Sequence, residues 1–332
     1  MGKNDCATKV FLSDRRVFAD LVNFGVFGGK QVVEANDLRD TDCEEVMSLA
    51  RNDGSSSYKK CLRDMAMEVA MQTSDGTKYL VVGVENQNKP HLAMPARCLL
   101  YDAMRHAKNL QHIITDNERK HIATMDYISG LCPEDRLPPV ITLVIYWGPG
   151  RWTGPRFLHE MIDYPNEHLK ELGVDYRLNL IEPATMDEDA FNNFRTDLGA
   201  VLHYVKAQND GKEWRRLLYE NERCRILSRH AAEVVQTVLG MEIPINQDEE
   251  VTDMCKALEQ IKQWAFEEGE QTGFAKGEQK GFAKGEQKGK QDGIQATVSI
   301  LKGLQLDMEL IQEKLMAAYS LTADEVQKYI QG

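Results

Sequence analysis

Between residues 78 and 148 the sequence reads as a strand, a helix and a second strand, and this succession leaves few folds open. The first strand is KYLVVGVENQ (78–87), and the second is PPVITLVIYWG (138–148), whose unbroken apolar run is typical of a strand buried on both faces. Residues 93–114 between them predict a helix, with Pro95 tolerated in its first turn. The unit therefore predicts a parallel strand pair with a right-handed crossover, and an α/β fold.

A hairpin is predicted immediately before this unit. The segments RDMAMEVAM (63–71) and KYLVVGVENQ (78–87) flank QTSDGT (72–77). An Asp-Gly pair between two such runs is a strong hairpin signal. The first buried strand should therefore have an antiparallel neighbour on one side and a parallel neighbour on the other.

The register of the hairpin decides which polar side chains meet at its open end. With residues 75–76 as the loop, Asp64 lies opposite Gln87, and Glu85 is then its diagonal neighbour. With residues 74–75 as the loop, Asp64 lies directly opposite Glu85. Unless a bulge intervenes, both carboxylates share one face of the sheet, within about 4.5–8 Å of each other.

Two neighbouring carboxylates repel each other unless a positive charge joins them. A hard divalent cation such as Mg²⁺ binds through one or two carboxylates, keeps several waters and grips substrate phosphate. Asp64 and Glu85 are therefore a candidate metal site. The alternative is that Asp64 only starts a strand and Glu85 is a solvated strand end.

Composition limits what the chain can bind. Its 332 residues are 42% apolar and 28% charged, and the net charge is −12. No basic region indicates nucleic-acid binding by bulk charge, so DNA would have to be bound at a local site where a metal neutralises phosphate. The seven scattered cysteines form no C-x-x-C pair and predict reduced thiols. Without a signal region or a long apolar window, we expect a cytoplasmic protein with no membrane contact.

Four regions are expected along the chain. They are a core at residues 1–155, a mostly helical region at 156–266, a repeat tract at 267–293 and a helical tail at 294–332. Further elements are predicted as a helix at 14–27 capped by Asp14 or Ser13, a short strand KQVVEA at 30–35, acidic loop material at 37–45, a strand-like YRLNLIEP at 176–183, and helices near 157–172, 186–207, 211–225, 228–240 and 249–266.

The repeat tract contains the octapeptide GFAKGEQK twice in succession, with glycine at every fourth position from 269 to 293. Each glycine costs a helix about 0.8–1 kcal/mol relative to alanine, which favours a flexible linker. Glycines spaced by four also let another backbone approach closely. The second interpretation is therefore a self-associating helix that makes the protein a homo-oligomer through the repeat and the tail.

The ordered set of elements resembles the PD-(D/E)XK nuclease core, a restriction-endonuclease-like mixed sheet flanked by helices. More narrowly, it is similar to the recombination-promoting nuclease/putative transposase (Rpn) family. The resembling pieces are LSDRRVFADLVNFGVFGGK, LRDMAMEV, VGVENQNKPHLAMPARCLLYDA, VITLVIYWGPGRWTGPRFLHEMI and the C-terminal Gly/Glu/Lys repeat. They cover the first half of the chain closely and the tail loosely.

The resemblance implies a metal-dependent DNA endonuclease using Mg²⁺ or Mn²⁺. It implies that Asp64, Glu85 and the backbone carbonyl of Asn86 hold the metal, which activates water for in-line attack on phosphate. Asp20 is the candidate for an additional acid on the first helix, with Asp14 as the alternative there.

The chain departs from the pattern at Gln87, which stands where the motif has Lys. Gln occurs at this position in the family, but a neutral amide supplies no charge near the phosphate. Arg97 and Tyr101, spaced i and i+4 on the following helix, are candidates to contact substrate. Two other functions remain open: a DNA-binding recombination-accessory protein with weak or no catalysis, and a helical oligomerising scaffold.

Overall fold

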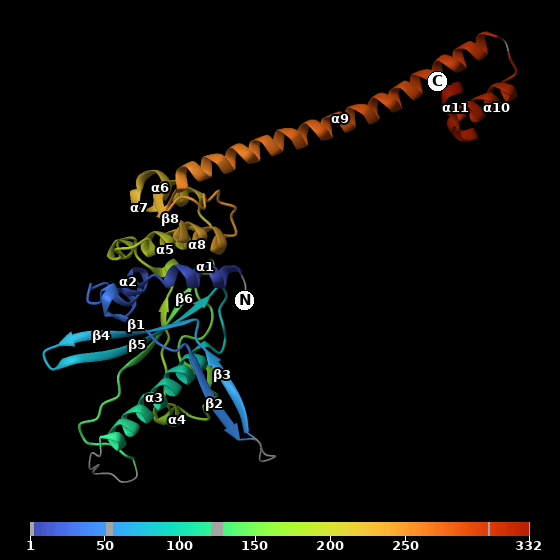
Figure 1. Cartoon of the computed structure of the whole chain (residues 1–332). Coiled ribbons are helices and arrows are strands. Elements are labelled where there is room, and N and C mark those ends of the chain that lie inside the picture. The colour runs from blue at the N-terminus through green and yellow to red at the C-terminus, as the bar shows by residue number, and fades with distance from the viewer. Residues whose placement is uncertain (1–2, 51–55, 121–128, 305, 332) are drawn as a thin grey trace. The chain divides into compact units, whose positions relative to one another are not determined.

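The computed structural model describes residues 3–50, 56–120, 129–304 and 306–331 of the chain (Figure 1). The chain divides into two compact units, Met1–Ile261 and Lys262–Gly332. The first unit holds the sheet and the candidate site, and the second consists of helices.

A five-stranded mixed sheet forms the centre of the first unit, with the strand order β1-β4-β5-β6-β7. Its antiparallel side pairs β1 with β4 and β4 with β5, and its parallel side pairs β5 with β6 and β6 with β7. The strands are β1 (Leu38–Asp40), β4 (Met65–Thr73), β5 (Gly76–Gln87), β6 (Val140–Tyr146) and β7 (Asn179–Ile181). The predicted α/β class, the hairpin and the parallel pair are confirmed.

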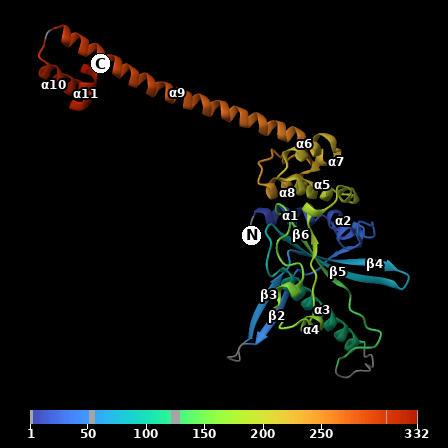
Figure 2. The ribbon, with the colours of Figure 1, turned by 180° about the vertical axis from the view of Figure 1, so that it is seen from behind.

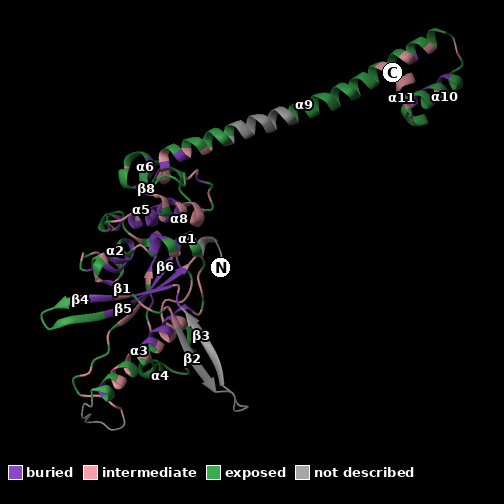
Figure 3. Ribbon diagram, viewed as in Figure 1, coloured by how far each residue is buried: buried purple, intermediate pink, exposed green. Residues whose placement is uncertain are grey.

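Helices cover both faces of this sheet (Figures 1 and 2). On one face Val82, Val84 and Leu143 share a core with apolar side chains of α1 (Lys3–Leu12), α2 (Arg15–Gly25), α5 (Leu198–Ala207) and α8 (Arg229–Leu239). On the other face Val144 and Tyr146 pack against α3 (Met94–Arg119) through Met94 and Cys98. Figure 3 shows the buried residues concentrated along these two interfaces. The helix predicted at 93–114 is confirmed, with Pro95 in its first turn.

The start of α2 follows the sequence, but the strand predicted after it does not form. Asp14 caps α2 by accepting the Arg16 backbone N–H at 2.8 Å. The prediction of a strand at 30–35 (KQVVEA) is wrong. The Asn23 side chain takes the backbone N–H groups of Val32 and Val33 and donates to the Val33 carbonyl. This segment therefore bonds to a helix side chain instead of a neighbouring strand, and the 3-10 helix η1 (Ala35–Asp37) follows it.

A second hairpin begins within the segment at 37–45 that was expected to be acidic loop material. It consists of β2 (Glu44–Ala50) and β3 (Ser56–Leu62), paired in antiparallel register from Glu44 opposite Leu62 to Ala50 opposite Ser56. Residues 51–55 lie outside the described part of the chain. The sequence did not predict this hairpin, because β3 (SSYKKCL) is mostly polar and shows little apolar period.

The β4–β5 hairpin has the second of the two registers left open by the sequence, the one with residues 74–75 as the loop. Met65 pairs with Val84, and Thr73 pairs with Gly76, so Ser74 and Asp75 form the loop. Gly76 has a φ of 107°, a backbone conformation that side chains disfavour. Continued by one residue beyond β4, this register sets position 64 opposite position 85.

The sheet continues past residue 155, the expected end of the core, because β7 adds a parallel strand to β6. Several predicted helices are shorter than expected. Pro165 ends the 157–172 segment as a continuous helix, and Asn166 caps a new one by accepting the Leu169 N–H. The remaining elements here are η2 (Leu158–Met161), α4 (Glu167–Leu172), η3 (Pro183–Thr185), η4 (Glu188–Asn193), α6 (Gly211–Glu220), α7 (Glu222–Arg225), β8 (Ile226–Ser228) and β9 (Val251–Asp253).

The repeat tract is helical, as the second of the two interpretations proposed. It lies within α9 (Met254–Gly303), which is followed by α10 (Met308–Tyr319) and α11 (Ala323–Gln331). Ile294, Val298, Ile311, Leu315 and Val326 form a small core for the end of α9 and the two helices after it. Across the described residues, no helix combines the length and apolar character that crossing a membrane requires.

A buried ion pair connects the residue before β4 to α3. The Arg63 Nη2 atom lies 2.7 Å from Asp102 Oδ1, with side-chain exposures of 1% and 10%. The Thr142 and Tyr176 hydroxyls each donate to Asp102 at 2.6 Å. A Cβ on Gly83 would lie 2.8 Å from the Arg63 side chain, so only glycine leaves room for it. Burial raises the pKa of Asp102, although its hydrogen-bond donors and Arg63 oppose that shift.

Arg63→Met tests this ion pair, because it leaves the buried Asp102 carboxylate without its cation. Loss of one partner of a buried pair costs about 3–5 kcal/mol. We expect the free energy of unfolding, measured by urea titration at neutral pH, to fall by about 3 kcal/mol. Arg15→Met is the control, since Arg15 and Asp40 form an exposed pair that is worth at most about 1 kcal/mol. Equal effects of the two substitutions would contradict the assignment.

Gly281→Ala combined with Gly285→Ala tests the helical repeat tract. A Cβ at either position would meet no atom within 4 Å. Each alanine should therefore stabilise the helix by about 0.8–1 kcal/mol. Thermal unfolding followed by far-ultraviolet circular dichroism should show higher helicity and a later transition. Gly240→Ala should have the opposite effect, because Gly240 ends α8 with a φ of 64°. The measurement is made at a protein concentration at which the chain is monomeric, and a loss of helicity in the double variant there would contradict a helical tract whose glycine face is open.

Candidate metal centre at the end of β5

Four elements converge on the carboxyl end of β5. Asp64 stands immediately before β4, and Glu85 is among the last residues of β5. Arg97 comes from the first turn of α3, and Lys9 comes from the last turn of α1. The β4–β5 register brings the two carboxylates together, and the helices on the two faces of the sheet supply the two cations.

The Asp64 carboxylate links β5 to α1. Its Oδ2 atom accepts the backbone N–H of Asn86 at 2.8 Å, and its Oδ1 atom lies 3.0 Å from Lys9 Nζ. The Asp64 side chain is 26% exposed and the Lys9 side chain 24%. Both charged groups therefore remain open to a ligand from solvent.

The Glu85 carboxylate is almost fully buried, with a side-chain exposure of 1%. Its Oε2 atom lies 3.2 Å from Arg97 Nη2, whereas its Oε1 atom is buried without a hydrogen-bond partner among the described residues. Burial, followed by the negative charge of Asp64, raises the pKa of Glu85 from 4.5 to about 7. A buried, unsatisfied carboxylate oxygen is costly, and it is the kind of atom that a cation satisfies.

These residues fit a divalent cation. Asp64 and Glu85 offer hard oxygen ligands, and a bound cation would satisfy the orphaned Oε1 atom and favour the ionised form of Glu85. Asn86 donates its backbone N–H to Asp64, and its side-chain Oδ1 accepts the Trp147 indole N–H at 2.9 Å. The part of its backbone carbonyl in holding metal stays a prediction.

Gln87 offers no charge to the centre. It is partly buried, and its backbone carbonyl accepts the Trp147 N–H at 2.8 Å. Its side chain makes no hydrogen bond to any residue that the structure describes. The position where the family motif has Lys is thus occupied by an unengaged amide.

Arg97 and Tyr101 lie together at the site, as their i, i+4 spacing predicted. Arg97 Nη2 donates to the Tyr101 hydroxyl at 2.8 Å while it pairs with Glu85. Arg97 is 35% exposed, but Tyr101 is only 5% exposed and its ring also lies under the Arg63 guanidinium. Arg97 can therefore reach a substrate, and the Tyr101 hydroxyl bonds Arg97 from within the core; a direct contact of Tyr101 with substrate stays a prediction.

Asp20 and Asp14 make their contacts elsewhere. The Asp20 Oδ2 atom accepts the backbone N–H groups of Arg195 and Thr196 and the Thr196 hydroxyl at 2.7–2.9 Å. It lines a cavity of about 780 Å³ to which neither Asp64 nor Glu85 contributes. These bonds hold the turn between η4 and α5, which also explains why the helix predicted at 186–207 is interrupted. Asp14 is occupied in capping α2.

Lys9 is the residue of this site that the sequence did not reveal. It precedes Asp64 by 55 positions and belongs to a helix that was not predicted. Its partner could be found only after α1 was packed on the sheet. The one local signal is that α1 is followed by the Ser13-Asp14 cap of α2, which fixes where the first helix must end.

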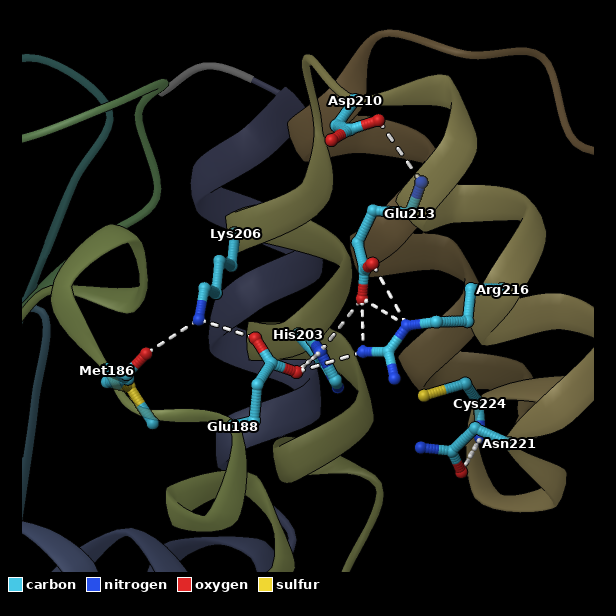
Figure 4. Close-up of polar contacts among 9 residues, drawn as sticks. All are labelled: Met186, Glu188, His203, Lys206, Asp210, Glu213, Arg216, Asn221 and Cys224. Carbon is cyan, nitrogen blue, oxygen red and sulfur yellow. Dashed lines mark hydrogen bonds and ion pairs between the residues drawn. The ribbon is translucent and has the colours of Figure 1, made fainter.

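A second polar cluster joins η4, α5 and α6 (Figure 4). Glu188, His203 and Glu213 present ligand-type atoms within 4.8 Å of one another. His203 Nε2 lies 2.9 Å from Glu188 Oε2 and 3.7 Å from Glu213 Oε1. Burial lowers the pKa of His203, so its ring is neutral at neutral pH, although both glutamates favour its charged form.

Two cations already form ion pairs with the carboxylates of this second cluster. Arg216 Nη2 lies 2.5 Å from Glu213 and 3.1 Å from Glu188, and Lys206 Nζ lies 2.6 Å from Glu188 (Figure 4). The hydrogen bond from Lys206 is the main reason why the pKa of Glu188 is lowered. A metal would have to displace Arg216, so the cluster is explained as an ion-pair network joining three elements.

No protein-family model, curated protein or solved structure matches this chain. The case for a function therefore depends on the contacts described above.

Metal affinity should depend on pH through Glu85. A cation binds the ionised carboxylate, and the pKa of Glu85 is about 7, so at lower pH the metal must displace a proton. We expect Mn²⁺ affinity, measured by isothermal titration calorimetry, to be about tenfold weaker at pH 6 than at pH 8. Glu85→Gln should remove most of the affinity and its pH dependence.

The same shift predicts how the metal-free fold responds to pH. The raised pKa means that ionising Glu85 opposes folding: the effect is absent below about pH 4.5 and grows to about 3 kcal/mol as pH rises past 7.

The control for the metal-affinity prediction is Asp75→Asn, an exposed loop change, which should leave the pH dependence of Mn²⁺ affinity intact. An affinity that stays flat from pH 6 to pH 8 in the unmodified protein would contradict this role for Glu85.

Proposed function

We propose that the chain is a metal-dependent DNA endonuclease that uses Mg²⁺ or Mn²⁺ and hydrolyses a phosphodiester bond. The observation that carries the proposal is the orphaned Glu85 Oε1 atom beside the carboxylate of Asp64. A buried acid with a raised pKa, facing a second acid and two cations at a strand end, is characteristic of a functional site.

The arrangement of elements also supports a nuclease-like core. An antiparallel hairpin carries one acid before its first strand and one at the end of its second, and α3 and the parallel strand β6 follow. This is the order of elements on which the resemblance to PD-(D/E)XK nucleases rests. We therefore propose that the sheet is a restriction-endonuclease-like core and that the helices after it are an accessory region.

The residues divide the work as follows. A bound divalent cation would polarise the scissile phosphate and lower the pKa of a water for in-line attack. Asp64 and Glu85 hold that cation. Arg97, fixed by Glu85 and Tyr101 and about one-third exposed, lies at the rim, where its guanidinium can donate to a phosphate oxygen.

DNA is the partner that this chemistry implies. The net charge of −12 gives no general attraction for a polyanion, so recognition would depend on the metal, Arg97 and Lys9. We also propose that the protein self-associates through the glycine-rich part of α9, whose described glycines 277, 281, 285 and 289 leave open space beside the helix. A dimer would present two such sites to one duplex.

One observation favours a second candidate function. Lys9 and Arg97 already pair with both acids, so the centre can be electrically satisfied without metal. A protein in that state would bind DNA without cutting it, as a recombination-accessory factor. Cleavage itself distinguishes the two functions.

Nicking of supercoiled plasmid tests the proposal. We expect the unmodified protein to nick DNA with Mg²⁺ or Mn²⁺ and not with a chelator present. Asp64→Asn and Glu85→Gln should each lower the rate by about 100-fold or more, since each removes a charge that holds the metal. Asp75→Asn, in the exposed hairpin loop, should cut normally. DNA binding without cleavage under every divalent metal would support the accessory function, and the absence of both would leave only the helical scaffold.

A further inference from the structure

The Lys9 side chain is held at the metal centre by the way α1 is built. Phe11 and Leu12 of the same helix are buried in the core that α1 shares with α8. The Lys9 carbonyl accepts both the backbone N–H and the hydroxyl of Ser13, at 2.9 and 2.6 Å. The end of the helix is therefore fixed, and the ammonium reaches Asp64 Oδ1 at 3.0 Å.

The stability of the fold does not account for this ammonium. Lys9 and Asp64 are each about one-quarter exposed, and ion pairs with that much solvent contribute about 0–1 kcal/mol. Asp64 already has the Asn86 N–H as a hydrogen-bond donor. A lysine on a helix that faces the open side of an acidic site is better explained by a ligand that carries negative charge.

The strand β5 itself supplies no positive charge to the centre at position 87, where the nuclease motif has Lys. Gln87 follows Glu85 by two residues and shares its face of the sheet, but its amide is neutral. Arg97 is held by Glu85 and Tyr101. Lys9 is a compact point charge on a flexible stem, and its ammonium would be released to a phosphate oxygen if Asp64 held a metal.

We propose that Lys9 is a catalytic residue of this site, which contacts the scissile phosphate and supplies the positive charge that Gln87 lacks. This inference rests on the proposed nuclease function. A water oxygen bonds to phosphorus, the bond from phosphorus to the leaving sugar oxygen breaks, and that oxygen takes up a proton while the water loses one to solvent. Lys9 stays protonated throughout and stabilises the negative charge that grows on the phosphoryl oxygens.

A charge-relocation experiment tests the proposal in the full-length protein. Lys9→Met keeps the length of the side chain and removes its charge. We expect it to nick plasmid about 100-fold more slowly while its Mn²⁺ affinity stays within about tenfold of the unmodified protein, because Lys9 does not hold the metal. Adding Gln87→Lys to Lys9→Met should recover at least about tenfold of the lost rate, since the charge returns to the same centre from the strand. Lys9→Arg should be intermediate.

Lys108→Met is the matched control. Lys108 also projects from a helix to an aspartate, Asp42, at 2.7 Å, and its loss should not change nicking. The inference is overturned if Lys9→Met cuts within about threefold of the unmodified protein, if it loses metal affinity as steeply as rate, or if no relocated charge restores cleavage. If the unmodified protein itself does not cut, the nuclease proposal fails first and takes this role of Lys9 with it.

Discussion

The pairing of β4 with β5 is the interaction on which the candidate site depends. Its register, Met65 with Val84, sets the preceding Asp64 opposite Glu85, and the Asn86 N–H then bonds the Asp64 carboxylate across the gap. A slip of one residue would turn every side chain of β4 to the other face and separate the two acids. The two-residue loop at positions 74–75 prevents that slip, because the adjacent Gly76 adopts a φ of 107° that closes the turn in this register.

Electrostatics at the end of β5 is balanced at a cost to the fold. Burial and the neighbouring Asp64 carboxylate raise the pKa of Glu85 to about 7, and its Oε1 atom has no hydrogen-bond partner in the part of the chain that the structure describes. Arg97 of α3 pairs with Glu85 on one face of the sheet, and Lys9 of α1 pairs with Asp64. In the Glu188–His203–Glu213 cluster, two cations, Arg216 and Lys206, likewise bind the carboxylates. The clusters differ in the Glu85 Oε1 atom, which is buried without a hydrogen-bond partner among the described residues, whereas no described carboxylate oxygen of the second cluster is in that state.

Strong local patterns in the sequence predicted much of the fold, and long-range contacts account for what they missed. The hairpin, α3, the buried strand β6 and the Asp14 cap all follow from turn chemistry and hydrophobic runs within a few residues. The proximity of Asp64 and Glu85 could be predicted because both belong to one hairpin, whose pairing depends on residues close together in the sequence. The KQVVEA strand failed because Asn23 of the preceding helix satisfies that backbone. The resemblance proposes Asp20 as an additional acid, and that role stays a prediction; the sequence did not indicate that its carboxylate accepts hydrogen bonds from residues 195–196, about 175 positions away.

Lys9 shows why the chemistry of such a site is harder to predict than its scaffold. The two proposed metal ligands, Asp64 and Glu85, belong to one hairpin, so its local register already sets their separation. A charge that contacts phosphate has no such restriction, since any element whose side chain reaches the open side of the sheet can provide it. In our proposal that element is α1, whose Phe11 and Leu12 are buried in the core of the first unit. Under this proposal, Gln87 changes which element supplies the positive charge, from the strand to α1, and the centre keeps that charge through Lys9.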